Sequence, residues 1–347
     1  MSELSQGEQG QVAAGEQTLN TRAGDNRLEN SVTVQLVNII RYGFLSVLLL
    51  FHTVLFSQEY NVQYEKIDSD SIVGRLWLPN NAAQSPAILL IGGSGGGYED
   101  QDAKWISSLG FVVLDLRFFG AKDLPKKLVN VPIEYFNTAA EWLHSHKAVK
   151  QGAIGLFAHS RGTEAAILTA SHNPLIKAVV LRAPSSIVWA GPGWAGFNVS
   201  AWSWNNEPVN FLNVGLIDGA VWLSRILRDK KLIKTRWMFE RALVNKKNVD
   251  LCRLPVEHIN ADLLLLSGMD DQQWPSTAMA EKLVSILDKS EFEFSYEHIA
   301  FESAGHRPAR RSQPDDTFAN GGTEIGNIDA HQKTKRLVKN FFDKSLR

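Results

Sequence analysis

A serine near the middle of the chain stands in a setting that suits nucleophilic catalysis. The apolar run 153–157 leads into Ala158-His-Ser-Arg-Gly162, and a segment with helical spacing begins at Thr163. Small residues at 158 and 162 allow a strand and the next helix to cross closely, in a sharp turn that projects Ser160 Oγ beyond a sheet. We therefore expect Ser160 to be a nucleophile. A serine that only caps the helix would not require small residues on both sides.

A nucleophilic serine needs a base, and the base needs an acid to orient it. Asp270 and Asp271 come just after the apolar run 262–266, and His306 follows the last extended segment of the chain. The order serine, acid, histidine is the one that accompanies this kind of turn. We expect His306 to be the base and Asp271 the acid, with Asp270 turning the loop. His159 is expected to be a packed neighbour that points away from the serine.

A glycine-rich loop, residues 92–97, follows the first run that reads as a parallel strand. Glycines let backbone N–H groups approach a substrate oxygen closely, so we expect an oxyanion hole here. The expected donors are the N–H of Arg161 and that of Ser94 or Gly95. A phosphate-binding loop is the competing interpretation, but no Lys-Ser/Thr pair follows and no acid stands at a ribose-binding position. We expect no cofactor, and the His and acidic residues show no metal-ligand spacing.

The elements that would position these residues alternate regularly from about residue 60. The first two segments, 62–67 and 72–78, form a hairpin-like pair. Short apolar runs follow that are typical of strands buried on both faces, at 87–91, 111–114, 153–157, 178–181 and 262–266. The last segment is an extended run at 294–300. Helical spacing occurs at 133–146, 163–171, 276–287 and 331–342. The pattern predicts a doubly wound α/β domain, with a mostly parallel central sheet and an N-terminal antiparallel hairpin.

One interval breaks this alternation. About 80 residues without a clear strand lie between residues 181 and 263, and they hold six of the 10 tryptophans. An insertion at the carboxyl edge of such a sheet lies above the ligand crevice, so we interpret residues 184–260 as a Trp-rich cap. Its tryptophans either line a hydrophobic pocket or pack the cap onto the core.

Composition excludes several kinds of protein. Lys plus Arg number 36 and Asp plus Glu 37, so no chain-wide field favours a nucleic acid partner. The one cysteine, Cys252, forms no internal disulfide and no cysteine-based zinc site, and we expect it to be a small buried apolar residue.

The N-terminal 57 residues are expected to lie outside the catalytic domain. Residues 1–30 are polar and predicted to be disordered. The uncharged apolar run 42–56 follows Arg41 and has the length of a signal-peptide core, with cleavage after Ser57. The chain 58–347 would then be exported, to a periplasm or the medium. A start of translation nearer Arg41 is one explanation for the polar stretch that precedes the run. The alternatives are a membrane anchor formed by residues 32–56, the only case in which a membrane partner is expected, and a buried core helix.

Taken together, these motifs resemble one branch of the α/β-hydrolases, the C-terminal catalytic domain shared by acyl-CoA thioesterases and bile acid-CoA:amino acid N-acyltransferases. The stretches that carry the resemblance are 90–97, 124–125, 133–136, 155–164, 177–184, 255–259, 267–276 and 304–306, within residues 85–347. The resemblance implies an α/β-hydrolase fold. It also places nucleophile, acid and base on Ser160, Asp271 and His306.

The resemblance also favours one of the family's two reactions over the other. In this family, transfer to amino acids is associated with cysteine at the turn and hydrolysis with serine, so Ser160 favours hydrolysis of a small-molecule ester or acyl thioester. The alternatives are an acyltransferase that passes the acyl group to an amino acid amine, and a non-catalytic binding protein on a hydrolase scaffold. Two features depart from the family. Only about 30 residues separate Gln58 from the first parallel strand, too few for its usual β-sandwich domain, and acyl-CoA is intracellular whereas export is expected here.

Overall fold

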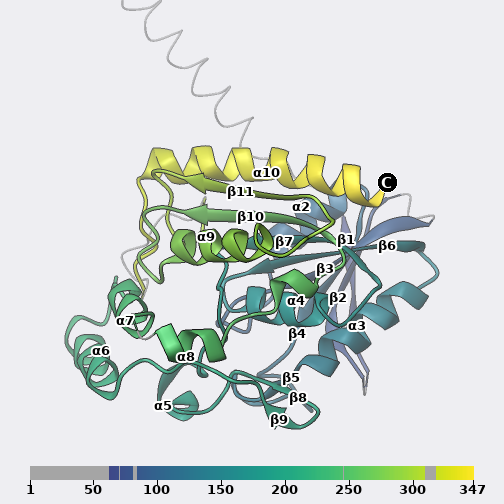
Figure 1. The fold of residues 1–347 in the computed structure, drawn as a ribbon. Coiled ribbons are helices and arrows are strands. Elements are labelled where there is room, and N and C mark those ends of the chain that lie inside the picture. The colour runs from purple at the N-terminus through teal and green to yellow at the C-terminus, as the bar shows by residue number, and fades with distance from the viewer. Residues whose placement is uncertain (1–61, 70, 81–83, 245, 309–317) are drawn as a thin grey trace, which may run out of the picture. The chain divides into compact units, whose positions relative to one another are not determined.

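A computed structural model describes residues 62–347 except 70, 81–83, 245 and 309–317 (Figure 1). Residues 60–347 form one compact unit. The expected disordered segment 1–30 and the apolar run 42–56 lie outside the described residues. Within the part of the chain that the structure describes, no helix combines the length and the hydropathy needed to cross a membrane.

The centre of the fold is an eight-stranded sheet in the order β1-β2-β4-β3-β6-β7-β10-β11. Its β1–β2 and β2–β4 pairs are antiparallel, and its other pairs are parallel. The strands are β1 (Gln63–Asp68), β2 (Val73–Leu78), β3 (Ser85–Ile91), β4 (Val112–Arg117), β6 (Val149–His159), β7 (Ile176–Arg182), β10 (Asp262–Gly268) and β11 (Tyr296–Phe301). This arrangement confirms the predicted fold class.

Helices cover both faces of the sheet, because the side chains of its central strands alternate between two apolar layers. In β3, Leu89 and Ile91 belong to one buried cluster, whereas Ile88 and Leu90 belong to the other. The first cluster includes residues of α3 (Ile133–Ser145), α4 (Gly162–Ala170) and α9 (Ser276–Leu287), and the second includes residues of α2 (Asp100–Ser108) and α10 (Glu324–Leu346) (Figure 1).

The predicted cap interval contains short strands that its sequence pattern did not reveal. A three-stranded sheet in the order β5-β8-β9 joins β5 (Val131–Pro132), β8 (Trp202–Trp204) and β9 (Glu207–Pro208). Strands of two or three residues are too short to display an alternating pattern. The helical segments here are α5 (Gly193–Gly196), α6 (Leu216–Asp229), α7 (Arg236–Ala242), α8 (Lys246–Leu251) and the 3₁₀ turn η1 (Val256–His258).

The topology explains why distant residues meet. The strands β3, β6, β10 and β11 run parallel, so their carboxyl ends lie at one edge of the sheet. The loop 92–97, Ser160, Asp271 and His306 each follow one of these ends. In open α/β sheets this edge forms the ligand crevice.

Candidate active site

Ser160 occupies a strained turn between β6 and α4. Its φ is +55°, a left-handed conformation that costs a non-glycine residue energy, and its N–H donates to the carbonyl of Arg182 over 2.9 Å. A Cβ added to Gly162 would lie 2.3 Å from the carbonyl oxygen of Gly92, so only glycine allows α4 to start this close to the loop after β3. The local sequence therefore forms the sharp turn that its small residues predicted.

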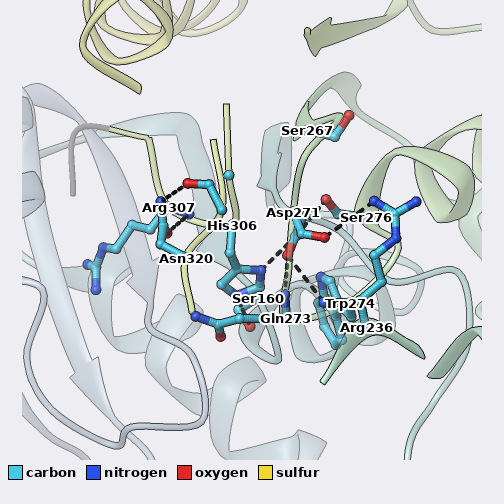
Figure 2. Close-up of polar contacts among 12 residues, drawn as sticks. Ser160, Arg236, Ser267, Asp271, Gln273, Trp274, Ser276, His306, Arg307 and Asn320 are labelled. Carbon is cyan, nitrogen blue, oxygen red and sulfur yellow. Dashed lines mark hydrogen bonds and ion pairs between the residues drawn. The ribbon is translucent and has the colours of Figure 1, made fainter. Parts of the chain in front are cut away.

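Ser160, His306 and Asp271 form a continuous chain of hydrogen bonds (Figure 2). His306 Nε2 lies 2.9 Å from Ser160 Oγ, and His306 Nδ1 lies 2.8 Å from Asp271 Oδ2. A carboxylate only accepts, so Nδ1 carries the proton and Nε2 is left to accept from the serine hydroxyl. The structure thus brings together the three residues that the sequence singled out, in an order suited to moving a proton from the serine to the histidine.

The carboxylate of Asp271 is held by several donors besides His306. Its Oδ1 accepts from the backbone N–H groups of Gln273, over 2.8 Å, and Trp274, over 3.2 Å. Its Oδ2 accepts from Ser276 Oγ over 2.7 Å. Asp271 is fully buried, and these donors satisfy its oxygens and fix the orientation of its side chain. These supporting residues were not predicted from the sequence, although all of them follow Asp271 within five positions.

Asp270 has different partners. Its Oδ2 accepts from the backbone N–H of Gly322 over 2.8 Å, and its Oδ1 accepts from Gln272 Nε2. It therefore ties the loop after β10 to the segment before α10, and Asp271 is the carboxylate that contacts His306.

A buried charged network lies behind the turn. Arg182 donates to both oxygens of Asp102, at 2.6 and 3.3 Å, and its Nε donates to His159 Nδ1 over 3.4 Å. Burial and the nearby Arg182 lower the pKa of His159 well below its usual value, so His159 is neutral near pH 7. Its ring centre lies 5.0 Å from that of His306.

A second buried pair links the turn to the cap. Arg161 Nε lies 3.1 Å from Glu164 Oε1, and Arg161 Nη2 donates to the carbonyls of Trp189 and Ala190 over 2.9 and 3.0 Å. Burial raises the pKa of Glu164 to about 7. Its Oε2 accepts from Trp202 Nε1 over 2.9 Å and from the Trp189 N–H over 3.1 Å. From the sequence only a backbone role was expected for Arg161, although opposite charges at positions i and i+3 beside an apolar helix indicate such a pair.

A cavity of about 340 Å³ opens beside Ser160 and His306. Its walls are mostly aliphatic and aromatic, and Arg161 and His306 are its ionisable lining residues among those described. The apolar lining includes Trp189, Phe197, Leu212, Val214, Leu216, Trp222, Met238, Phe239, Trp274 and Phe318. A site of this size and composition suits an apolar ligand group that reaches the serine.

The cap tryptophans divide between the two expected roles. Trp189 and Trp222 line the cavity, as does Trp274 from outside the cap. Trp202 is fully buried in the core cluster and donates to Glu164, and the Trp204 ring lies over His172 at 4.5 Å. Both expectations therefore hold, each for different tryptophans.

The glycine-rich loop lies directly against the serine. A Cβ on Gly93 would lie 3.2 Å from Ser160 Cβ. Ser94 and Arg161 both line the cavity, whereas Gly95 is not among the described lining residues. Of the two expected donors from this loop, Ser94 is therefore the one placed at the cavity.

Two further expectations concern metals and the cysteine. Over the described residues, no group of three or more His, Cys, Asp or Glu side chains is arranged to hold a metal ion. Cys252 is buried in the apolar cluster that includes Trp189, and burial raises the pKa of its thiol. A neutral buried thiol away from the turn is no competitor for Ser160 as a nucleophile.

The order and directions of the strands define an α/β-hydrolase fold. Solved structures with the same fold include an acylaminoacyl peptidase of Pyrococcus horikoshii, with a TM-score of 0.53, 15% identity and coverage of 85% of this chain and 43% of that one. A puromycin-hydrolyzing peptidase of Mycobacterium tuberculosis gives a TM-score of 0.51 and 12% identity, covering 82% and 39% of the two chains. At such identities the likeness concerns the fold alone.

The chain belongs to the family described as "BAAT / Acyl-CoA thioester hydrolase C terminal", whose match covers residues 131–346. The resemblance inferred from the motifs is thereby confirmed. Mouse mitochondrial acyl-coenzyme A thioesterase 2 is 28% identical over 232 residues, which are 67% of this chain and 47% of the relative. Mouse acyl-coenzyme A amino acid N-acyltransferase 2 is 26% identical over 299 residues, 82% and 66% of the two chains. The chain thus spans about half to two thirds of these relatives' length.

Proposed function

We propose that the protein is a serine hydrolase that cleaves an ester or acyl thioester with a hydrophobic acyl group. The observation that carries the proposal is the chain of hydrogen bonds from Ser160 through His306 to Asp271, beside a mostly apolar cavity. Family membership supports acyl chemistry, since relatives are named acyl-coenzyme A thioesterases.

The proposed reaction begins with attack of Ser160 Oγ on the carbonyl carbon of the substrate. His306 Nε2 takes the hydroxyl proton, and Asp271 stabilises the imidazolium that results. The oxyanion accepts hydrogen bonds from the backbone N–H groups of Arg161 and Ser94. The carbon–oxygen or carbon–sulfur bond to the leaving group then breaks, and His306 returns the proton to that group. An acyl-Ser160 ester remains.

The second half of the reaction regenerates the serine. His306 removes a proton from water, whose oxygen attacks the acyl carbon, and the bond to Ser160 Oγ breaks as the serine regains a proton. The product is the free acid. The mostly apolar walls of the cavity suit the acyl part of the substrate.

Turnover by a serine variant tests the proposal. Ser160→Ala should abolish hydrolysis of p-nitrophenyl esters and of acyl-CoA while the circular dichroism spectrum stays that of the wild type. Retention of activity would remove Ser160 from the mechanism, and absence of activity in the wild type on all such substrates would favour the non-catalytic binding role.

An acyltransferase is the second candidate, supported by the relative named amino acid N-acyltransferase 2. The two activities separate in one experiment, in which glycine or taurine is added to the acyl donor and the products are resolved by mass spectrometry. If the protein is a hydrolase, the product should be the free acid at every concentration of the added amine. An N-acyl amino acid that grows with the amine concentration would identify transfer instead.

We also propose that the protein is exported after cleavage near Ser57. The support is the uncharged run 42–56 behind Arg41 in the sequence. Expression in the native cell followed by N-terminal sequencing should give a mature chain that starts near Gln58 in a periplasmic or secreted fraction. Recovery of the uncleaved chain in the membrane fraction would favour anchoring by residues 32–56.

A further inference from the structure

Helix α6 of the cap exposes a continuous apolar stripe. Leu216, Ala220, Leu223 and Leu227 recur at spacings of four, three and four residues, which places them on one helical face. Leu216 and Leu227 are 71% and 68% exposed, and Ile217 beside them is 75% exposed. Such spacing normally marks the face that a helix buries against its own protein, so here the described chain leaves that face without cover.

The opposite side of α6 is fixed to the protein, which determines where the stripe points. Asp218 is buried and its Oδ1 lies 2.9 Å from Arg241 Nη1 of α7. Trp222 lines the cavity. These contacts hold one side of α6 against the protein, and Figure 1 shows the helix at the outer edge of the cap. The stripe lies on the other side of the helix, where Leu216, Leu223 and Leu227 are exposed.

The region next to the stripe is strongly basic. Seven Lys and Arg residues and two acidic residues occur in 225–241, whereas the whole chain has a formal charge of −1. Arg228, Arg236 and Arg241 have carboxylate partners in ion pairs. The exposed Lys230 and Lys234 lie on the segment that follows α6. A partner for this surface must therefore combine apolar groups with negative charge.

An anionic lipid bilayer has both properties. Amphipathic helices with a leucine-rich face and basic residues beside it lie in the bilayer interface, with the apolar face among the acyl chains and the cations at the headgroups. A second copy of the same surface would bring two basic regions together, which like-charge repulsion opposes.

The stripe adjoins the cavity. Leu216 and Ala220 belong to the stripe and also line the cavity, together with Gly219 between them. A bilayer in contact with the stripe would thus lie at the edge of the cavity that reaches Ser160. If the proposed function holds, an acyl chain could pass between bilayer and cavity with little exposure to water.

We propose that α6 and the basic segment after it are a docking surface for an anionic lipid bilayer. The test uses the full chain with Cys252→Ala, so that a single new cysteine can carry a polarity-sensitive fluorophore. Leu227→Cys places the label on the stripe. Ile325→Cys is the matched control, because Ile325 is an apolar residue 81% exposed on α10. Both labelled proteins retain the N-terminal run, so any membrane binding by that run is common to the pair.

Vesicles of phosphatidylcholine with phosphatidylglycerol should shift the emission of the Leu227→Cys label to shorter wavelength, with little change at the control position. Vesicles of phosphatidylcholine alone should give a weaker shift. Lys230→Gln with Lys234→Gln should weaken the partition into anionic vesicles at least about tenfold. Hydrolysis of a water-soluble ester should stay at the wild-type rate in this double variant.

Three results would overturn the proposal. The first is no shift at position 227 with anionic vesicles, and the second is an equal shift at positions 227 and 325. The third is a shift at 227 that grows with protein concentration in the absence of lipid, which would show that a second copy of the chain covers the stripe.

Discussion

Nδ1 of His306 lies 2.8 Å from Oδ2 of Asp271, although the two residues come from different strand ends, 35 positions apart in the chain. The carboxylate fixes the tautomer of the imidazole and leaves Nε2 facing Ser160 Oγ at 2.9 Å. The adjacent carboxylate of Asp270 takes no part in this contact, because it accepts from Gly322 and Gln272. Substitutions of Asp270 and of Asp271 should therefore change the rate of hydrolysis to different extents.

The first prediction compares these two aspartates. Asp271→Asn should lower kcat for ester hydrolysis on the order of 10³-fold or more, because an amide at this position favours the wrong imidazole tautomer. Asp270→Asn keeps an oxygen that accepts from Gly322 and should change kcat only a few-fold. Steady-state kinetics on one p-nitrophenyl ester gives kcat for both variants and the wild type. A larger loss in Asp270→Asn would reassign the acid.

The second prediction concerns the buried pair that links the turn to the cap. Glu164→Ala removes the carboxylate beside Arg161 and leaves a buried guanidinium without an anion. The free energy of unfolding should fall by about 3–5 kcal/mol in urea titrations. Asp329→Ala is the control, because it breaks an exposed pair with Lys333 on α10 and should cost less than about 1 kcal/mol. Equal losses in the two variants would show that the buried pair has no special role.

The third prediction concerns the size of the cavity. Val214 lines it, and Val214→Trp should fill part of its volume. Hydrolysis of long-chain p-nitrophenyl esters should fall at least about tenfold while that of the acetate ester changes little, since overpacking penalises only the ligand that needs the space. A uniform fall over all chain lengths would indicate that the acyl group binds elsewhere.

The fourth prediction uses the buried Asp115 of β4. Burial raises its pKa to about 8, its Oδ2 accepts from the Glu99 N–H over 2.9 Å, and its Oδ1 has no hydrogen-bond partner among the described residues. A carboxyl group with a raised pKa stabilises the fold below its unfolded pKa, and this contribution is lost as the pH rises through the folded pKa. From pH 4 to pH 8, the wild type should therefore lose stability relative to Asp115→Asn, by about 1.4 kcal/mol for each unit of pKa shift.

Urea unfolding of both proteins across this range measures the difference directly, and the other titrating groups cancel in the comparison. A difference that stays constant with pH would mean that Asp115 ionises in the folded protein much as it does in the unfolded chain.

The sequence alone predicted the parts of the fold in which apolar residues form short runs or recur with a clear period. The buried strands are short apolar runs because both of their faces are covered, and Ile88 and Leu89 point into opposite layers. Ser160 could be located because its turn requires small neighbours, and Gly162 has no room for a Cβ. The choice of Asp271 over Asp270 agrees with the contact to His306.

Other features depend on tertiary contacts that local patterns do not encode. Sequence alone left open whether the tryptophans of the cap line a pocket or pack against the core, and the structure shows that Trp222 lines the cavity whereas Trp202 packs in the core. The leucines of α6 have the spacing of a buried face, and only the structure shows Leu216 and Leu227 to be exposed. Burial of Arg161 beside Glu164 likewise depends on how the cap covers the turn.

Covalent labelling by a fluorophosphonate tests most directly whether Ser160 is an activated nucleophile. Intact-mass analysis of the wild type should show a single adduct, peptide mapping should place it on Ser160, and Ser160→Ala should show none. The absence of an adduct on the wild type, or an adduct that persists in Ser160→Ala, would contradict the proposed mechanism.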